Sequence, residues 1–309
     1  MSVSTLDNSL FEGLDVEVSF DAPLGPLTWY RVGGSAEALV DPHSIESLGE
    51  LLRRCHASKI AVRVLGSGAN LLVADEGVPG VVLRLSHPVF RQLKGLDRGD
   101  ALIAVGGGYD LMRLVNETTR AGLGGLEGLA GVPASIGGAV RMNAGGAYGQ
   151  ISDVVASVLV MDDCGQTRRI ARDDIAFGYR RSGITELVVL EVELQLEPAE
   201  AASLIERKKD VFAQKKHEQP FGAATCGCAF KNPTDDQGQP CDSAGRLIDA
   251  CGLKGYRLGG AVVSDRHANF IAAESGATAD DLIRLIDHVQ REVVEQTGVQ
   301  LVREVVIWP

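Results

Sequence analysis

Two glycine-rich segments carry the residues best suited to hold a phosphorylated or flat ligand. The longer is Gly122–Gly149, GLGGLEGLAGVPASIGGAVRMNAGGAYG, and the shorter is Gly66-Ser-Gly-Ala-Asn-Leu-Leu-Val73. Glycine weakens helices and strands, so the longer segment is not expected to form a packed helix or a regular strand. Closely spaced backbone N–H groups bind anions well. The two loops are therefore expected to enclose a pyrophosphate from both sides.

A disordered linker is the alternative for the longer segment, and a simple strand–turn is the alternative for the shorter one. Against a linker, apolar residues recur through the longer segment in the manner of buried anchors: Leu126, Leu129, Val132, Ile136 and Val140. A cofactor cradle is the interpretation that we favour.

Several well-known site motifs are missing from the sequence. Gly66-Ser-Gly68 supplies only the first two glycines of a G-x-G-x-x-G fingerprint, and neither a P-loop nor a G-x-S-x-G nucleophile elbow occurs. The six cysteines show no C-x-x-C spacing, and the six histidines are scattered without an H-E-x-x-H motif. We therefore expect neither a Rossmann-type dinucleotide site nor a bound metal.

The composition is that of a globular protein. The chain has 309 residues, of which 45% are hydrophobic and 23% charged, enough for two or three compact domains. Its formal net charge of −11 argues against nucleic-acid binding, which needs a basic surface. No apolar run is long enough to cross a membrane, and the first residues do not resemble a secretory signal. We expect a cytoplasmic protein with reduced thiols.

The hydrophobic patterns predict three segments that mix helices and strands, an α+β fold. The first is expected to contain the helix Ser44–Ala57 and the strands Ile60–Leu65, Leu71–Val73 and Val81–Leu85. The second should contain the strand Ala101–Val105, the helix Asp110–Ala121, strands near Val154–Met161 and Leu187–Leu196, and a turn at Met161–Gly165. The third should contain the helices Ala199–Lys216, Ser243–Cys251 and Thr278–Thr297, and the strands Cys226–Lys231, Asn269–Ala272 and Leu301–Trp308.

Further motifs follow one another along the chain. They are Tyr30-Arg-Val-Gly-Gly34, Gly125-Leu-Glu-Gly-Leu-Ala-Gly-Val-Pro133, Met142-Asn-Ala-Gly-Gly-Ala-Tyr-Gly149, Tyr179-Arg180, Phe230-Lys-Asn-Pro233 and Ser243-Ala-Gly-Arg-Leu-Ile-Asp249. Together with the Gly66–Val73 loop, this set resembles the UDP-N-acetylenolpyruvoylglucosamine reductase (UDP-N-acetylmuramate dehydrogenase) family over about Trp29 to Pro309. The length and the continuous third segment resemble the shorter subclass of the family.

The resemblance implies an FAD-binding fold of the vanillyl-alcohol-oxidase or PCMH type, followed by a C-terminal α+β substrate-binding domain. It implies FAD-binding subdomains at residues 1–86 and 87–197 and a substrate domain at 198–309, with return of the last strand to the FAD domain as an alternative. It also implies non-covalent FAD, NADPH as co-substrate and a nucleotide-sugar substrate. Hydride would pass from NADPH through the flavin to C3 of UDP-N-acetylglucosamine enolpyruvate, giving the peptidoglycan precursor UDP-N-acetylmuramate.

Three catalytic side chains of the family match Arg180, Cys228 and Glu304. Arg180 would hold the substrate carboxylate, where a guanidinium fork stabilises the charge that develops as hydride arrives. Cys228 would protonate C2; the family often has serine here, and a thiol with a pKa near ~8.5 is a far better acid than an alcohol. Glu304 would donate a hydrogen bond to the developing enolate, because the apolar alternation of its strand should raise the pKa of its carboxyl group.

Each assignment has an ordinary structural alternative. Without the motifs, Arg180 could be a solvated loop arginine beside Arg181, Glu304 a salt-bridge partner and Cys228 a buried core thiol. Cys226, two residues earlier, is expected to be a neighbour without a catalytic role.

The remaining site residues also follow from the resemblance. The FAD contacts would be Gly66, Ser67, Gly68, Ala69, Asn70, Leu71, Gly131, Val132, Pro133, Ala134, Ser135, Gly137, Gly138, Asn143, Ala144 and Gly145. The substrate contacts would be Tyr148, Tyr179, Lys231 and Asn232, with Lys254 and Arg257 as candidates for the substrate diphosphate. We expect a monomer.

Two other functions stay open from the residues alone. The first is an FAD-dependent oxidase or dehydrogenase of another small molecule on the same fold, which would react readily with oxygen and ignore the UDP-sugar. The second is a non-catalytic flavin or nucleotide-sugar binding module, which would require a missing catalytic position. None of the three positions is missing.

Overall fold

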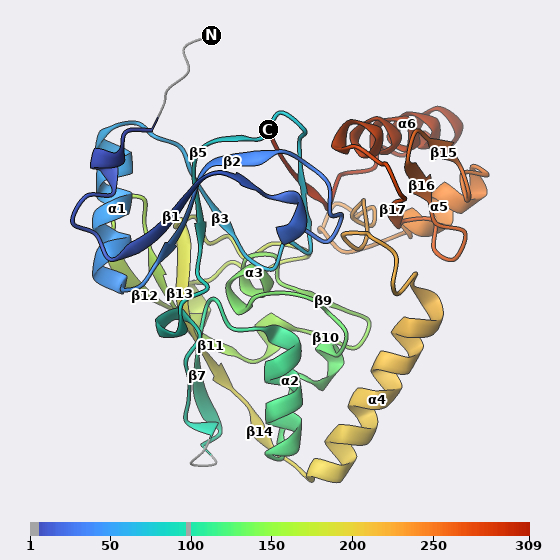
Figure 1. Ribbon diagram of the computed structural model, residues 1–309. Helices are drawn as coiled ribbons and strands as arrows, with labels where there is room; N and C mark the ends of the chain where they lie inside the picture. The colour runs from blue at the N-terminus through green and yellow to red at the C-terminus, as the bar shows by residue number, and fades with distance from the viewer. Residues whose placement is uncertain (1–5, 97–99) are drawn as a thin grey trace. The chain divides into compact units, whose positions relative to one another are not determined.

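The computed structural model describes residues 6–96 and 100–309 (Figure 1). It divides into two compact units. Unit 1 consists of Met1–Ala22, Ala36–Ser67 and Pro79–Ala213, and unit 2 of Pro23–Ser35, Gly68–Val78 and Gln214–Pro309. Two short early segments thus group with the C-terminal third of the chain. The division at residues 86 and 197 stays a prediction.

The first sheet of unit 1 has the strand order β1-β2-β5-β3. Its strands are β1 (Val16–Pro23), β2 (Ser35–Pro42), β5 (Val78–Arg84) and β3 (Val62–Leu65), and β3 pairs with β5 in parallel. Helix α1 (Ile45–Ala57) begins after Ser44, whose hydroxyl accepts a hydrogen bond from the N–H of Ser47. Its buried face, which includes Leu48 and Leu52, packs into the hydrophobic core of this region.

The second sheet of unit 1 is antiparallel, in the order β12-β11-β13-β7-β6. Its strands are β12 (Thr167–Ala171), β11 (Val155–Met161), β13 (Val188–Gln195), β7 (Leu102–Gly106) and β6 (Leu93–Lys94). Helix α2 (Leu111–Arg120), capped by Asp110, belongs to the same core. The short strands β8 (Leu123–Gly124) and β14 (Glu197–Pro198) pair with each other.

The glycine-rich stretch corrects one expectation, because it contains helix α3 (Ile136–Arg141). The hydroxyl of Ser135 caps this helix by accepting the N–H of Gly138 at 3.3 Å. Gly137 has only 3.2 Å of room between an added Cβ and the carbonyl oxygen of Gly107, so a glycine suits this position. Tight packing thus outweighs the low helix propensity of glycine. The stretch ends in the hairpin β9 (Gly145–Gly146) and β10 (Gly149–Gln150).

Unit 2 is built on a three-stranded antiparallel sheet of β15 (Arg257–Leu258), β16 (Ala261–Val263) and β17 (Ile271–Ala273). Helix α6 (Ala279–Thr297) packs on this sheet (Figure 1). Thr278 and Asp281 form a capping box at its beginning. Unit 2 also contains α5 (Ala244–Ala250) and the parallel pair β4 (Leu71–Val73) and β18 (Val306–Trp308). The unit boundary falls inside helix α4 (Ala201–Glu218).

One predicted strand is absent from the structure, and another is shorter than predicted. The segment Cys226–Lys231 forms isolated bridges at Cys228 and Phe230 in place of a regular strand, and Gly227 has a positive φ of 78° that breaks the extended backbone. The last strand begins only at Val306. Short 3-10 helices complete the described chain: η1 (Asn8–Leu10), η2 (Gly25–Leu27), η3 (Pro88–Phe90), η5 (Glu127–Leu129), η6 (Ile151–Asp153) and η7 (Arg172–Asp174). Among the described residues, no helix is long and apolar enough to span a membrane.

Candidate functional site

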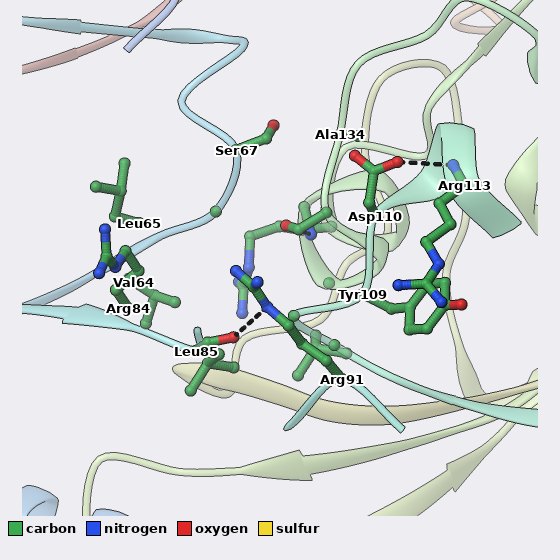
Figure 2. A pocket seen from close by; sticks show the side chains of 18 of the residues that line it. Val64, Leu65, Ser67, Arg84, Leu85, Arg91, Tyr109, Asp110, Arg113 and Ala134 are labelled. Atoms are coloured by element: carbon green, nitrogen blue, oxygen red, sulfur yellow. Dashed lines mark hydrogen bonds between the residues drawn. The ribbon is translucent and has the colours of Figure 1, made fainter. Parts of the chain in front are cut away.

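A cavity of about 360 Å³ lies within unit 1 (Figure 2). One wall is formed by residues 64–67, at the end of β3 and in the loop that follows. The opposing walls are formed by residues 107–110, after β7, and by Ala134, Ser135, Gly137 and Gly138 around the beginning of α3. Ligand pockets measure roughly 300–1,000 Å³. The cavity can therefore accept part of a cofactor-sized ligand.

The two glycine loops meet at this cavity, and close packing restricts the loop residue Gly66 as well as Gly107, which follows β7. A Cβ added to Gly66 would lie 2.5 Å from the Oγ atom of Ser135, and one added to Gly107 would lie 2.0 Å from the carbonyl oxygen of Val189. Real Cβ atoms do not approach other atoms so closely, so Gly107 excludes a side chain, and a side chain at Gly66 would force the Ser135 hydroxyl to move. The backbone itself therefore forms much of the wall, as in a cradle for a phosphorylated group.

Arginine side chains surround the cavity, although the chain as a whole is acidic: Arg84, Arg91, Arg113 and Arg141. In Figure 2, Arg84 and Arg113 lie on opposite sides of the view. Arg84 pairs with Asp41 at 3.0 Å, and Arg113 pairs with Glu117 at 2.9 Å. These carboxylates compensate two of the positive charges.

Arg91 and Arg141 are held by backbone carbonyl groups. The Nε atom of Arg91 donates to the carbonyl oxygen of Leu85 at 3.3 Å, and the guanidinium of Arg141 donates to the carbonyl oxygens of Ile184 and Leu187 at 3.2 and 3.1 Å. Burial lowers the pKa of Arg141, although an arginine stays protonated at neutral pH. The cavity therefore carries fixed positive charge next to a glycine-lined wall, an environment suited to a diphosphate.

The cavity brings together six of the residues that the sequence analysis selected for FAD: Gly66, Ser67, Ala134, Ser135, Gly137 and Gly138. The predicted contacts Gly68–Leu71 belong to unit 2, and Gly131–Pro133 and Asn143–Gly145 do not line this cavity. Sequence reasoning missed Gly107 and Gly108, although the triplet Gly106-Gly-Gly108 is a visible signal of close backbone approach.

Arg180 lies in unit 1 in an unusual backbone conformation, with a positive φ of 54°. Its Nη1 atom donates to the carbonyl oxygen of Gly145 at 2.8 Å, and its guanidinium carbon is 5.4 Å from the ring centroid of Tyr179. Gly145 is at the base of the β9–β10 hairpin, and Tyr148 is exposed on the connection between the two strands. The hairpin, Tyr179 and Arg180 thus form one local group.

Asn143 fixes this local group. It is buried, with a positive φ of 43°, and its Nδ2 atom donates to the carbonyl oxygen of Gly178 at 3.1 Å and to Oε1 of Gln150 at 3.2 Å. Its Oδ1 atom accepts the N–H of Ser152 at 3.2 Å. Asn143, predicted to contact FAD, therefore links the hairpin to the turn that precedes Arg180.

Cys228 and Glu304 are neighbours within unit 2. The N–H of Glu304 donates to the carbonyl oxygen of Ala229 at 2.8 Å, and the carbonyl oxygen of Glu304 accepts from Nδ2 of Asn70 at 3.0 Å. Cys228 forms a bridge with Phe270 on the other side of the same segment. The structure therefore places the thiol and carboxyl residues on adjacent backbone segments.

The residues on either side of Glu304 do not form the buried apolar row that the alternating sequence pattern predicted. Val302 is 58% exposed and Val306 is 40% exposed, whereas Leu301 and Val305 are buried. The regular strand begins only after Glu304, so the residues before it do not follow a two-residue alternation. The expected apolar row is therefore absent, and the role of Glu304 as a hydrogen-bond donor to the developing enolate depends on the family motif alone.

Cys226 differs from Cys228 in its surroundings. Its side chain is only 3% exposed, and its Sγ atom donates to the carbonyl oxygen of Leu71 at 3.2 Å. Burial raises the pKa of Cys226 to about 12. It is a structural thiol of the core, whereas Cys228 is only partly buried.

The predicted substrate contacts of unit 2 lie near helix α5. The Oδ1 atom of Asn232 accepts the N–H of Ala244 at 3.0 Å, at the beginning of that helix, and Lys231 precedes Asn232 directly. Lys254 and Arg257 each form a salt bridge, with Asp249 at 2.7 Å and with Glu274. A substrate diphosphate would have to compete with these carboxylates.

Comparisons with known proteins fit this geometry. Residues 219–308 match the C-terminal domain of UDP-N-acetylenolpyruvoylglucosamine reductase, and residues 36–171 match an FAD binding domain. The second match contains the two loops and most of the cavity wall.

Individual reductases and a solved reductase structure are also similar to this chain. A UDP-N-acetylenolpyruvoylglucosamine reductase of Syntrophobacter fumaroxidans is 39% identical over 306 residues, which cover 98% of this chain and 87% of the relative. That of Bacillus subtilis is 34% identical, over 94% of each chain. The crystal structure of the Thermus caldophilus reductase aligns with a TM-score of 0.80 at 38% identity, covering 96% of this chain and 100% of that chain. The predicted α+β fold with an FAD-binding domain is confirmed.

Proposed function

We propose that this chain, which belongs to the UDP-N-acetylenolpyruvoylglucosamine reductase family, is an FAD-dependent enzyme that converts UDP-N-acetylglucosamine enolpyruvate to UDP-N-acetylmuramate with NADPH. One observation carries the proposal: the chain matches the reductases over nearly their whole length, and its glycine-lined cavity falls within the FAD-domain match. The product is a precursor of peptidoglycan.

The residues of the cavity fit FAD. A ligand with a diphosphate needs close backbone approach and fixed cations, and the cavity provides both, through Gly66, Gly107 and Gly138 and through Arg91 and Arg141. The hydroxyls of Ser67 and Ser135 add hydrogen-bonding groups to the same wall. We propose that these residues hold the cofactor, together with the predicted contacts of both glycine loops.

Bound FAD supplies a hydride acceptor for NADPH and a hydride donor for C3 of the enolpyruvyl group. The chain must then supply one proton at C2, since hydride plus proton completes the reduction of the double bond. We propose that Sγ of Cys228 gives this proton. Cys228 is the partly buried thiol of its segment, whereas the buried Cys226 has a pKa raised to about 12 and is occupied by the carbonyl oxygen of Leu71.

Arg180 is proposed to hold the substrate carboxylate, where negative charge increases as hydride reaches C3. Its left-handed backbone supports a functional role, because a non-glycine residue in this conformation costs about 1–3 kcal/mol and such residues cluster at functional sites. Glu304 is proposed to donate a hydrogen bond to the developing enolate. Its main chain is held by hydrogen bonds to Ala229 and Asn70, which supports the proposal by placing Glu304 on a backbone segment next to that of Cys228.

Isotope labelling tests the reaction directly. The FAD-loaded protein is incubated in D2O with NADPH and UDP-N-acetylglucosamine enolpyruvate, and the product is analysed by mass spectrometry and NMR. The proposal predicts NADPH oxidation that depends on the UDP-sugar, with solvent deuterium at C2 and also at C3, because the hydrogen on N5 of the reduced flavin exchanges with solvent before it is transferred. Rapid NADPH oxidation by oxygen, unchanged by the UDP-sugar, would instead identify an oxidase or dehydrogenase of another substrate.

The cellular location and the oligomeric state of the enzyme are also proposals. NADPH and nucleotide sugars are metabolites of the cytoplasm, so we place the enzyme there. We propose a monomer, which light scattering coupled to size-exclusion chromatography tests at the concentrations used for activity.

A further inference from the structure

Three possible metal ligands come together on unit 1, and none of them lines the FAD cavity. His56 lies in the last turn of α1, and Asp163 and Cys164 lie in the turn between β11 and β12. One ligand atom from each residue lies within 4.8 Å of the other two. The Nδ1 atom of His56 is 3.1 Å from Oδ2 of Asp163, across 107 residues of sequence. That separation explains why motif spacing does not reveal the cluster.

The turn that carries Asp163 and Cys164 is held in place by its own hydrogen bonds. The Oδ1 atom of Asp162 accepts the N–H groups of Cys164 and Gln166 at 2.9 and 2.8 Å. Gly165 has a positive φ of 75°, and a Cβ added there would lie 2.2 Å from the carbonyl oxygen of Gly49 in α1. The turn therefore packs directly against the helix that carries His56.

Helix α1 is equally well fixed. Leu52 and Cys55 are completely buried in the core of unit 1, and His56 follows Cys55 directly. The backbone positions of the three candidate ligands are thus set by packing, and Cys164 itself is partly buried. The side chains of His56 and Asp163 are 53% and 66% exposed, so solvent water has access to the cluster.

The donor atoms suit a borderline-soft divalent cation. Imidazole nitrogen, carboxylate oxygen and thiolate sulfur are the ligands of Zn²⁺, at distances of about 2.0–2.3 Å. In a tetrahedron of these dimensions the ligand atoms lie roughly 3.3–3.8 Å apart. Small side-chain rotations would bring the present separations to that value. A water molecule can complete the coordination.

We propose that His56, Asp163 and Cys164 form a surface binding site for Zn²⁺. On binding, the Cys164 thiol releases its proton to solvent and forms a sulfur–zinc bond, and the Nδ1 lone pair of His56 and one carboxylate oxygen of Asp163 provide the other protein ligands. The ion would link the end of α1 to the β11–β12 turn. The site is independent of the FAD and substrate chemistry.

Metal titration of point variants tests the site. The full-length, FAD-loaded protein is treated with a chelator, exchanged into metal-free buffer and titrated with Zn²⁺ in a calorimeter. Wild type and the control C241S, which removes an exposed thiol of unit 2, should each bind one equivalent with the same affinity. H56A and C164S should bind at least about tenfold more weakly, since loss of even an outer-shell partner costs about 10- to 100-fold.

Cobalt and alkylation give readouts that identify the ligands. Co²⁺ should produce a thiolate-to-metal absorption band in wild type that is missing in C164S, and Zn²⁺ should protect Cys164, but not Cys241, from iodoacetamide in peptide mapping. Thermal unfolding of the metal-free variants should stay close to wild type, because the His56 side chain is exposed and Cys164→Ser replaces a partly buried thiol by a hydroxyl of similar size. Absence of saturable binding, or equal binding by wild type, H56A and C164S, would overturn the proposal and place any bound metal elsewhere.

Discussion

The substitution Gly138→Ala separates the folding of the FAD cavity from its function. Gly138 lies inside helix α3 and lines the cavity. A Cβ added there meets only the Oγ atom of Ser135 within 4 Å, at 3.2 Å, and otherwise points into open space. The new methyl group would therefore occupy room that the cofactor needs.

The two expected effects have opposite signs. Alanine is better than glycine in a helix interior by roughly 0.8–1.0 kcal/mol, and the close contact of the new Cβ with the capping hydroxyl of Ser135 offsets part of that gain, so the apoprotein should be about as stable as wild type. A methyl group forced into a filled site costs about 1–3 kcal/mol, which corresponds to FAD binding that is weaker by about 5- to 150-fold.

The assay compares apoprotein stability by circular dichroism with FAD affinity by quenching of flavin fluorescence. The matched control is Gly49→Ala, another glycine inside a helix of unit 1 that does not line the cavity; it should keep wild-type FAD affinity. A G138A variant that folds normally and binds FAD as wild type does would refute the assignment of this cavity. A G138A variant that loses several kcal/mol of stability would contradict the packing argument.

Further predictions concern the thiol, a helix cap and a buried histidine. C228A should lose turnover while NADPH still reduces the flavin, and C228S should keep partial activity; full turnover by C228A in steady-state assays would exclude the acid role. T278A removes the hydroxyl that accepts the N–H of Asp281 and should lower the free energy of unfolding by about 0.5–2 kcal/mol, measured in urea; no change would show that the cap contributes nothing. Burial lowers the pKa of His267 below its ordinary 6.5, and its Nδ1 accepts the N–H of Asn269 at 3.2 Å. The unfolded chain therefore binds this proton more readily, and stability should fall as pH decreases below about 6.5. H267Q should weaken that dependence, and identical pH profiles for the two proteins would show that His267 does not contribute.

Local signals in the sequence predicted many of the elements that build the fold. Four predicted helices begin at a residue that occupies the N-cap position in the structure: Ser44, Asp110, Ser243 and Thr278. These signals succeed because a cap is satisfied by backbone groups only three residues away. The same locality explains the correct turn between β11 and β12.

Packing between distant segments was harder to predict. Helix α3 forms in a glycine-rich stretch that packs closely on distant segments: an added Cβ at Gly137 would lie 3.2 Å from the carbonyl oxygen of Gly107 and 3.4 Å from the Cβ atom of Val189. The alternation around Glu304 was misleading, because the backbone there is not a regular strand. The pairing of the two glycine loops was predicted, but the individual contact between Gly66 and Ser135 was not. Gly107, which lines the same cavity, was overlooked.

The central claim is that the chain binds FAD and passes reducing equivalents from NADPH to the enolpyruvyl sugar. The most direct test is the visible spectrum of the FAD-loaded protein without oxygen. The account predicts the yellow colour of oxidised flavin, bleaching when NADPH is added, and return of the colour when UDP-N-acetylglucosamine enolpyruvate follows. Protein that cannot be loaded with FAD, or reduced flavin that stays bleached after the sugar is added, would contradict it.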